Sequence, residues 1–304
     1  MTRKPDPLSP ESVLAKVRNQ ARPGLTPHHA QVIFILERFL ARVAQSTHRD
    51  RFVLKGGILL YLTGKGPASR PTIDIDMLAQ SLPSALLDQT LAEIAQVEVG
   101  DRIVFDPGAM TSEEIREEGL YPCRRYTIPF TYGRNYKGVI KLDLSFGDPV
   151  FPSPRLITLP ARFQGQVGGE LLAYPVEAVL AEKTQTILVR GLLSTRAKDI
   201  FDVWNLARTE PDLHLALITE SLRVVAIYRG TDLAMATIAL TEEFAQSPIQ
   251  NRIWNQFLNR ERLTAPALPE VMVEVRSFMD PLHQALAEDH PADRVWNLET
   301  HFWG

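Results

Sequence analysis

The stretch Arg70-Pro71-Thr72-Ile73-Asp74-Ile75-Asp76-Met77-Leu78 decides the fold of this chain. Apolar and polar residues alternate along it, which predicts a β-strand with one buried face. In a strand, positions i and i+2 point to the same side, so Asp74 and Asp76 share a face, about 6–7 Å apart. Two negative charges that close are costly unless a cation lies between them, and carboxylates suit Mg²⁺. For this pair taken alone, an exposed strand with a polar face is the alternative.

A second acidic strand position is Asp143. Residues 122–132 and 137–146 are two alternating runs, and the turn-forming residues between them predict a hairpin. Asp143 faces away from its apolar neighbours Leu142 and Leu144. If its strand lies next to the first one, three carboxylates converge and suit two divalent ions, a clamp for in-line nucleotidyl displacement. The alternative is an edge strand that exposes Asp143 to solvent.

A double glycine, Gly56-Gly57, precedes an apolar helical segment. Glycines at this place allow a close approach to the backbone, and the helix N-terminus offers free N–H groups to a phosphate. The G-x-x-x-x-G-K-[ST] spacing of a P-loop is absent.

The composition is that of an ordinary globular protein, with 304 residues, 45% hydrophobic and 23% charged. A single cysteine, Cys123, excludes an intrachain disulfide. The longest apolar runs, such as residues 32–36, fall far below the roughly 18 residues of a membrane helix. The first residues lack the apolar run of a secretory signal, so we expect a cytoplasmic protein without a membrane segment.

Charge and proline content indicate the organisation of the chain. The net charge is −3, but residues 1–55 carry ten basic and four acidic side chains, which favours a polyanionic partner or, alternatively, a solvated helix face. Four prolines between residues 149 and 160 interrupt regular structure, and helical patterns prevail from residue 174. We therefore expect basic helices over residues 1–50 packed on a core of residues 51–160, followed by a helical domain over residues 161–304.

The order of these elements resembles the polymerase-β-type nucleotidyltransferase superfamily, and more narrowly the AbiEii/AbiGii toxins of type IV toxin–antitoxin pairs. The resemblance rests on residues 52–57 (FVLKGG), 70–76 (RPTIDID), 177–183 (EAVLAEK) and 196–202 (RAKDIFD). It extends from about residue 10 to about residue 210. It implies an α/β (α+β) fold, in which a small mixed sheet forms the nucleotidyltransferase core and a mainly helical region follows.

The resemblance also implies site residues. Two Mg²⁺ ions would be held by Asp74, Asp76 and Asp143. Lys183 would neutralise the triphosphate as a point charge, with Asp199 rather than Asp202 orienting it or helping to deprotonate the acceptor hydroxyl. A solvated helix lysine and an intrahelical ion pair with Arg196 are the alternatives for Lys183 and Asp199. Phosphorylation of Thr72 would block the metal site. The remaining nucleotide-binding residues would be Lys55, Gly56, Gly57 and Arg70.

The implied activity is transfer of a nucleoside monophosphate from an NTP to an acceptor hydroxyl, with release of pyrophosphate. The resemblance points to the 3′ end of tRNA as the acceptor, so that translation is blocked, and to a cognate antitoxin as a partner. Two alternatives remain at this point, namely transfer of a nucleotidyl or phosphoryl group to a protein hydroxyl, and a non-catalytic binding module on the same fold.

Overall fold

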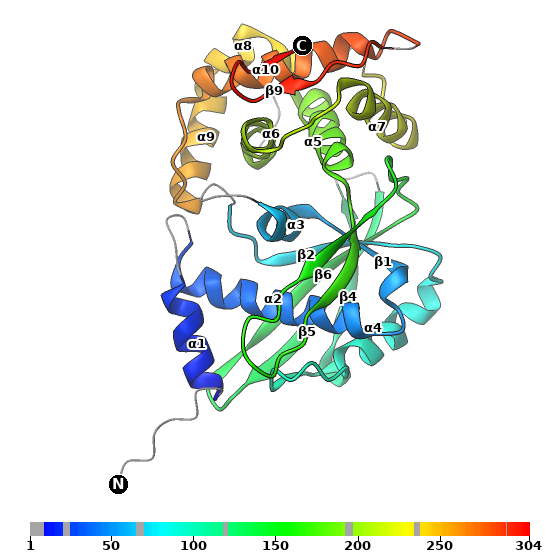
Figure 1. Cartoon of the computed structure of the whole chain (residues 1–304), viewed down its shortest axis with the longest axis vertical. Helices are drawn as coiled ribbons and strands as arrows, with labels where there is room; N and C mark the ends of the chain where they lie inside the picture. Colours follow the sequence, from blue (N-terminus) through cyan, green and yellow to red (C-terminus); the bar gives the residue numbers. More distant parts are fainter. Residues whose placement is uncertain are drawn as a thin grey trace. The chain divides into compact units, whose positions relative to one another are not determined.

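The structure is a computed structural model that describes residues 9–20, 25–64, 70–117, 121–191, 197–233, 238–289 and 291–304. The chain divides into two units. Figure 1 draws the chain in colours that follow the sequence. The first unit comprises Met1–Thr63, Arg70–Gly147 and Arg155–Ala173, and the second comprises Gly64–Ser69, Asp148–Pro154 and Tyr174–Gly304.

A mixed sheet is the centre of the first unit, with the strand order β3-β5-β6-β2-β1-β8-β7 and with β4 also paired to β5. The parallel pairs are β2 with β6 and β1 with β8, and the other pairs are antiparallel. This is the mixed α/β architecture that the sequence predicts. The strands are β1 (Phe52–Lys55), β2 (Asp74–Ala79), β3 (Ile103–Phe105), β4 (Thr111–Glu117), β5 (Tyr121–Tyr132), β6 (Tyr136–Phe146), β7 (Arg155–Leu159) and β8 (Gly169–Ala173).

The β5–β6 hairpin confirms the two alternating runs of the sequence. Tyr132 pairs with Tyr136 across the turn, where Gly133 has a φ of 66°. Glycine reaches this left-handed region without the steric cost that a Cβ brings. The turn therefore fixes the register of two long strands.

Helices α1 (Pro10–Asn19), α2 (Pro27–Gln45) and α4 (Leu87–Ala95) belong to the first unit, as does α3 (Gly56–Thr63). Helix α2 packs on the apolar sheet face, where the Phe39 and Phe105 rings lie 5.2 Å apart. Helix α4 lies on the same face, since Asp88 accepts a hydrogen bond from the Tyr126 hydroxyl at 2.7 Å. Burying a large apolar side chain such as Phe39 contributes about 1.5–3 kcal/mol, so this face anchors the sheet.

The sheet does not end at residue 160, where the sequence analysis placed the end of the core. Strand β7 fits between Pro154 and Pro160, because these five residues all retain the N–H groups that a ladder needs. Strand β8 then returns antiparallel to β7 and pairs with β1. The prolines interrupt the chain on both sides of a strand rather than excluding one.

The second unit is mainly helical, as expected, and contains one short hairpin. In the hairpin, the ring of Trp296 lies 4.9 Å from that of Phe278 in an edge-on contact. Helix α10 continues through Pro281, which lies inside it. The elements are α5 (Val176–Arg190), α6 (Ala197–Thr209), α7 (Leu215–Tyr228), α8 (Glu242–Gln246), α9 (Pro248–Glu261), α10 (Leu268–Ala285), β9 (Trp296–Asn297) and β10 (Phe302–Trp303).

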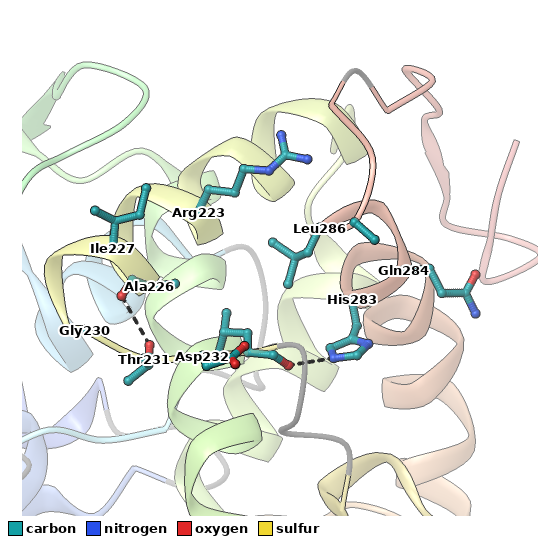
Figure 2. A pocket seen from close by; sticks show the side chains of 11 residues that line it. Arg223, Ala226, Ile227, Gly230, Thr231, Asp232, His283, Gln284 and Leu286 are labelled. Carbon is teal, nitrogen blue, oxygen red and sulfur yellow. Dashed lines mark hydrogen bonds between the residues drawn. The ribbon is translucent and has the colours of Figure 1, made fainter.

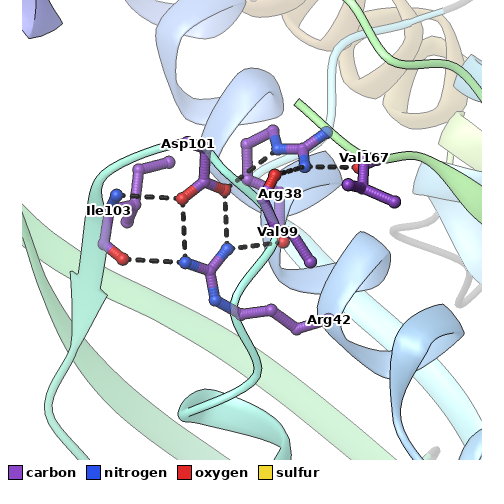
Figure 3. Close-up of polar contacts among 6 residues, drawn as sticks. All are labelled: Arg38, Arg42, Val99, Asp101, Ile103 and Val167. Carbon is purple, nitrogen blue, oxygen red and sulfur yellow. Dashed lines mark hydrogen bonds and ion pairs between the residues drawn. The ribbon is translucent and has the colours of Figure 1, made fainter. Parts of the chain in front are cut away.

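A buried ionic cluster ties α2 to the rest of the first unit (Figure 3). Asp101 accepts hydrogen bonds from Arg42 at 2.6 and 2.8 Å and from Arg38 at 3.0 Å, and all three side chains are at most 3% exposed. The guanidinium groups also reach the carbonyl oxygens of Val167 at 2.6 Å and Ile103 at 2.7 Å. Burial acts to raise the pKa of Asp101, but the hydrogen bonds and charge of Arg42 outweigh it and hold the pKa below its usual range.

Replacement of Asp101 by alanine leaves two buried guanidinium groups without their counter-ion. We expect Asp101→Ala to lower the free energy of unfolding by about 3–5 kcal/mol, measured by urea denaturation. Asp50→Ala is the matched control, because the Asp50 side chain is 77% exposed. Its loss should stay within about 0.5 kcal/mol. Equal losses in the two variants would contradict the anchoring role of the cluster.

A second buried carboxyl, Glu37, makes stability depend on pH. Burial raises its pKa to about 7, although Arg162 forms an ion pair with it and acts in the opposite direction. The folded state therefore binds more protons than the unfolded state between pH 4.5 and 7. The free energy that the protonated Glu37 side chain contributes to the folded state is fully present below about pH 4.5 and is lost as the pH rises through 7.

The variant Glu37→Gln mimics the protonated side chain and removes this dependence. We expect the unfolding free energy of the wild type, relative to Glu37→Gln, to fall by about 2–3 kcal/mol between pH 4.5 and pH 8. Urea denaturation of both proteins across this range measures the difference. A difference that is constant with pH would show that Glu37 stays ionised in the folded protein.

Candidate active site

The pairing of β2 with β6 brings the predicted carboxylates together. Asp76 lies directly opposite Asp143, and Asp74 lies opposite Lys141. Directly paired residues of neighbouring strands point to the same face of a sheet, so the three aspartates share one face. The intervening residues Ile75 and Leu142 are fully buried on the other face, which α2 and α4 cover. The sequence analysis required these two strands to be neighbours, and they are.

A row of charged residues crosses the sheet at this level. Lys55 of β1 pairs with Asp76, Asp143 pairs with Arg125 of β5, and Arg125 pairs with Glu113 of β4. We call Lys55, Asp76, Asp143, Arg125 and Glu113 the charged row. The two inner aspartates are thus flanked by one cation on each side. Lys55 is only 3% exposed, so this end of the charged row is buried within the first unit.

Arg125 binds Asp143 side-on within the charged row. Its Nε donates to Oδ1 of Asp143 at 2.8 Å and its Nη2 to Oδ2 at 2.7 Å. The Asp143 side chain is 13% exposed and that of Arg125 is 30% exposed. These hydrogen bonds raise the pKa of Arg125 further above its usual value, with the charges of Asp143, Asp74 and Glu113 adding to the effect.

Sequence analysis missed Arg125, although the hairpin contained the signal. Counting seven residues back from Tyr132 and seven forward from Tyr136 reaches Arg125 and Asp143, which the register pairs. The predicted turn alone therefore placed an arginine opposite the third carboxylate.

The double glycine lies against the same carboxylates. Gly56 has a φ of 71°, and a Cβ built on it would overlap with the Asp76 carboxylate. A Cβ on Gly57 would lie 2.9 Å from the Thr72 hydroxyl and 3.3 Å from Nη1 of Arg70. The start of α3 thus brings together five residues that the sequence analysis had selected, and glycine is needed at Gly56 for both its backbone angle and its lack of a side chain.

Thr72 is 4% exposed, and its hydroxyl donates to Oδ1 of Asp74 at 2.7 Å. A phosphate on this oxygen would bring added negative charge against the Asp74 carboxylate. Its burial means that the segment would have to open for a kinase to reach it. Regulation at Thr72 stays a prediction.

The oxygen-only donor set of Asp74 and Asp76 suits a hard cation such as Mg²⁺, and the strand register fits a third ligand at Asp143. The side-chain contacts differ, because Arg125 binds both oxygens of Asp143. In the part of the chain that the structure describes, no group of three or more His, Cys, Asp or Glu side chains is arranged to hold a metal ion. The Asp143 carboxylate is therefore already bound by a cationic side chain of β5.

The second unit holds the remaining predicted residues. Nζ of Lys183 on α5 donates to Oδ1 of Asp199 at 3.0 Å and to Oδ2 of Asp202 at 2.7 Å, both on α6. These side chains are only 4–11% exposed, so Lys183 is not a solvated helix lysine. Asp202, which the sequence analysis ranked below Asp199, makes the shorter of the two contacts with the lysine. Arg196 lies outside the described residues.

A cavity of about 710 Å³ lies between the C-terminal ends of α7 and α10 (Figure 2). Two of its polar side chains are committed to backbone carbonyl groups, because the His283 ring contacts the Leu233 carbonyl at 2.8 Å and Arg223 binds those of Ala285 and Glu288. None of the residues selected from the sequence lines this cavity. The charged row and the double glycine are therefore the better candidate for the site.

Comparison with known proteins identifies the family. A family model described as "Nucleotidyl transferase AbiEii toxin, Type IV TA system" matches residues 38–285. The chain belongs to this family. It is accordingly a nucleotidyltransferase toxin with an NTP substrate, and a type IV system implies a cognate antitoxin. Both the resemblance and the α/β fold expected from the sequence are confirmed. No helix among the described residues is long and apolar enough to span a membrane.

The solved structures that match this chain include proteins from three organisms. JHP933 from Helicobacter pylori has 16% identity and a TM-score of 0.48, with coverage of 85% of this chain and 93% of that one. The toxin MenT4 from Mycobacterium tuberculosis has 18% identity and a TM-score of 0.47, with coverage of 90% and 98%. An antigenic nucleotidyltransferase-like protein from Paracoccidioides brasiliensis has 14% identity and a TM-score of 0.39, with coverage of 80% and 93%. No curated protein matches the chain.

The contact between Gly56 and Asp76 can be tested by adding one methyl group. We expect Gly56→Ala to lower nucleotidyl transfer from a radiolabelled NTP by at least about 100-fold, because it displaces the Asp76 carboxylate. Gly165→Ala is the matched control. Gly165 also has a positive φ, of 80°, but no atom lies within 4 Å of its built Cβ.

The control variant carries only backbone strain of about 1–2 kcal/mol and should keep activity close to that of the wild type. Circular dichroism and thermal unfolding would show that both variants fold. Similar activity of the two variants would contradict a role for the close approach between Gly56 and Asp76.

Proposed function

We propose that this toxin transfers a nucleoside monophosphate from an NTP to the 3′-terminal hydroxyl of tRNA, and so blocks translation in the cytoplasm. The observation that carries the proposal is the meeting of Asp74, Asp76 and Asp143 on one sheet face beside the double glycine. Family membership supports the reaction type. The acceptor and the metal dependence are the parts that need a test.

Asp74 and Asp76, joined by Asp143, are the residues that would hold Mg²⁺, with two ions as the expected number. Bound there, Mg²⁺ would supply positive charge to the phosphates as a Lewis acid. The protein itself contributes position. Gly56 permits the close approach of the Asp76 carboxylate to the backbone at the start of α3, and Arg70 beside Gly57 offers a guanidinium that matches phosphate geometry.

Lys183 is proposed as the catalytic cation of the second unit. Two carboxylates hold its ammonium group in one place and so fix the position of its charge. A cation already in place does not need to reorganise when charge develops on the β- and γ-phosphates. Asp199 and Asp202 are in this proposal positioning residues that act through Lys183.

The basic N-terminal segment gives less support to tRNA binding than its net charge suggests. Arg38, Arg42 and Lys55 are buried and act inside the first unit. The exposed cations that remain among its described residues are Lys16, Arg18, Arg49 and Arg51. The choice of tRNA therefore rests on the family resemblance stated from the sequence and on the free hydroxyl that a tRNA 3′ end presents to an NTP.

The test uses the purified full chain, each of the four α-³²P-labelled NTPs, and either total tRNA or total cell protein. We expect label in tRNA, and no label when the 3′-terminal ribose of the tRNA has been oxidised with periodate before the reaction. The labelling rate should be at least about 100-fold lower in Asp76→Asn. Asp50→Asn, at an exposed surface position, is the control and should label as the wild type does.

Label in protein alone would overturn tRNA as the acceptor and leave nucleotidyl transfer in place. Equal labelling by Asp76→Asn and the wild type would overturn the assigned site. No label in either fraction, from a folded protein with any of the four nucleotides, would favour a binding module.

A further inference from the structure

The carboxylate of Asp143 is bound by an arginine, Arg125, that the proposed reaction does not require at that position. Both carboxylate oxygens of Asp143 accept from Arg125, at 2.8 and 2.7 Å. A side-on pair of this kind takes one lone pair of each oxygen and places a positive charge against the carboxylate. A divalent cation that chelates both oxygens from the same side would have to displace the guanidinium, so Arg125 and a metal ion compete for this carboxylate.

The charged row explains why an arginine lies there. Asp76 and Asp143 are direct neighbours on parallel strands, whose spacing is about 4.8 Å. Two ionised carboxylates at that spacing repel each other unless a positive charge is close. Without a metal ion, Arg125 supplies that charge from β5, and it stays partly exposed at 30%. Its side chain therefore already reaches the surface on the side where Asp74 and Asp76 lie.

We propose that Arg125 is an exchangeable counter-ion, which holds Asp143 until a divalent cation takes its place and then binds the phosphates of the nucleotide. The inference rests on the proposed function, since it assigns Asp143 to the metal. The exchange breaks two N–H···O hydrogen bonds and forms metal–oxygen contacts, and no proton is transferred. The released guanidinium presents its fork of donors, which matches phosphate oxygens, on the same face of the sheet.

This assignment makes two predictions of opposite sign for a single variant. Arg125→Gln removes the competitor, so the metal alone should bind more tightly. It also removes a phosphate donor, so the nucleotide should bind more weakly once the metal site is filled. A residue with a merely structural role would weaken both, because its loss would disorder the site.

The first measurement is titration with Mn²⁺ alone, followed by the electron paramagnetic resonance signal of the free ion. We expect Arg125→Gln to bind Mn²⁺ about tenfold more tightly than the wild type, because the fraction of protein with a free Asp143 rises. Asp143→Asn should bind at least about tenfold more weakly, as expected for a lost ligand.

Arg124→Gln is the matched control. Arg124 is the adjacent residue of the same strand, but it pairs with Leu144 and Glu114 and faces the opposite side of the sheet. Its Mn²⁺ affinity should equal that of the wild type. A change equal to that of Arg125→Gln would overturn the proposal by attributing the effect to general charge.

The second measurement is calorimetric titration, at saturating Mn²⁺, with the α,β-methylene analogues of the four nucleoside triphosphates. We expect the analogue that binds the wild type to bind Arg125→Gln about tenfold more weakly, as for loss of a charge-assisted contact. Unchanged nucleotide affinity would overturn the phosphate role. If Arg125→Gln does not fold, the same titrations are made with Arg125→Lys. An ammonium group cannot hold both carboxylate oxygens in the same way, so Mn²⁺ should again bind more tightly than to the wild type.

The outcomes separate this inference from the proposed function. Unchanged or weaker Mn²⁺ binding by the folded Arg125 variants, together with weaker binding by Asp143→Asn, would overturn the exchange and leave the metal site intact. Unchanged Mn²⁺ binding by Asp143→Asn would remove Asp143 from the metal and would overturn both.

Discussion

The parallel pairing of β2 with β6 is the constraint on which the rest of the site depends. It sets Asp76 opposite Asp143, and it does so because both strands commit their other face to the core through Ile75 and Leu142. Since the side-chain period of a strand is two, a slip of one residue would turn the three aspartates toward α2 and bury them. The apolar face thus specifies the position of the charged face, and the free energy of hydrophobic packing offsets the repulsion between the carboxylates.

Much of this arrangement could be predicted from the sequence, for reasons that are local. Strict alternation gave the faces of residues 74–78 and 137–146, and Gly133 gave the turn that fixes the hairpin. The family motifs gave Lys183 and Asp199. What local pattern cannot give is the choice of partner by a charged side chain. Arg125 faces Asp143 because of the hairpin register, and Arg38 and Arg42 are buried where Asp101 and several carbonyl groups accept hydrogen bonds from them. A charge count treats all three as surface cations.

The prolines also show what a local sequence pattern cannot predict. The prolines of residues 149–160 exclude regular structure only where an N–H group is required, and β7 fits between two of them. Its pairing with β8 is set by the edge of β8 that β1 leaves open, which is a property of the assembled unit. Similarly, α10 continues through Pro281 because its packed apolar face, from Val271 to Leu282, holds it on the core.

Charge balance on the candidate face links the metal to the nucleotide. Asp74, Asp76, Asp143 and Glu113 lie on it together with Lys55, Lys141 and Arg125, so the face is close to neutral without any ligand. A divalent cation that enters alone makes the face positive and sets one guanidinium free. A polyphosphate that enters alone meets the carboxylates. Each ligand removes the charge imbalance that the other creates, and thermodynamic reciprocity then requires that each raises the affinity for the other by the same factor. On this basis the near-neutral row keeps the fold stable without ligands and makes joint binding more favourable than binding of either ligand alone.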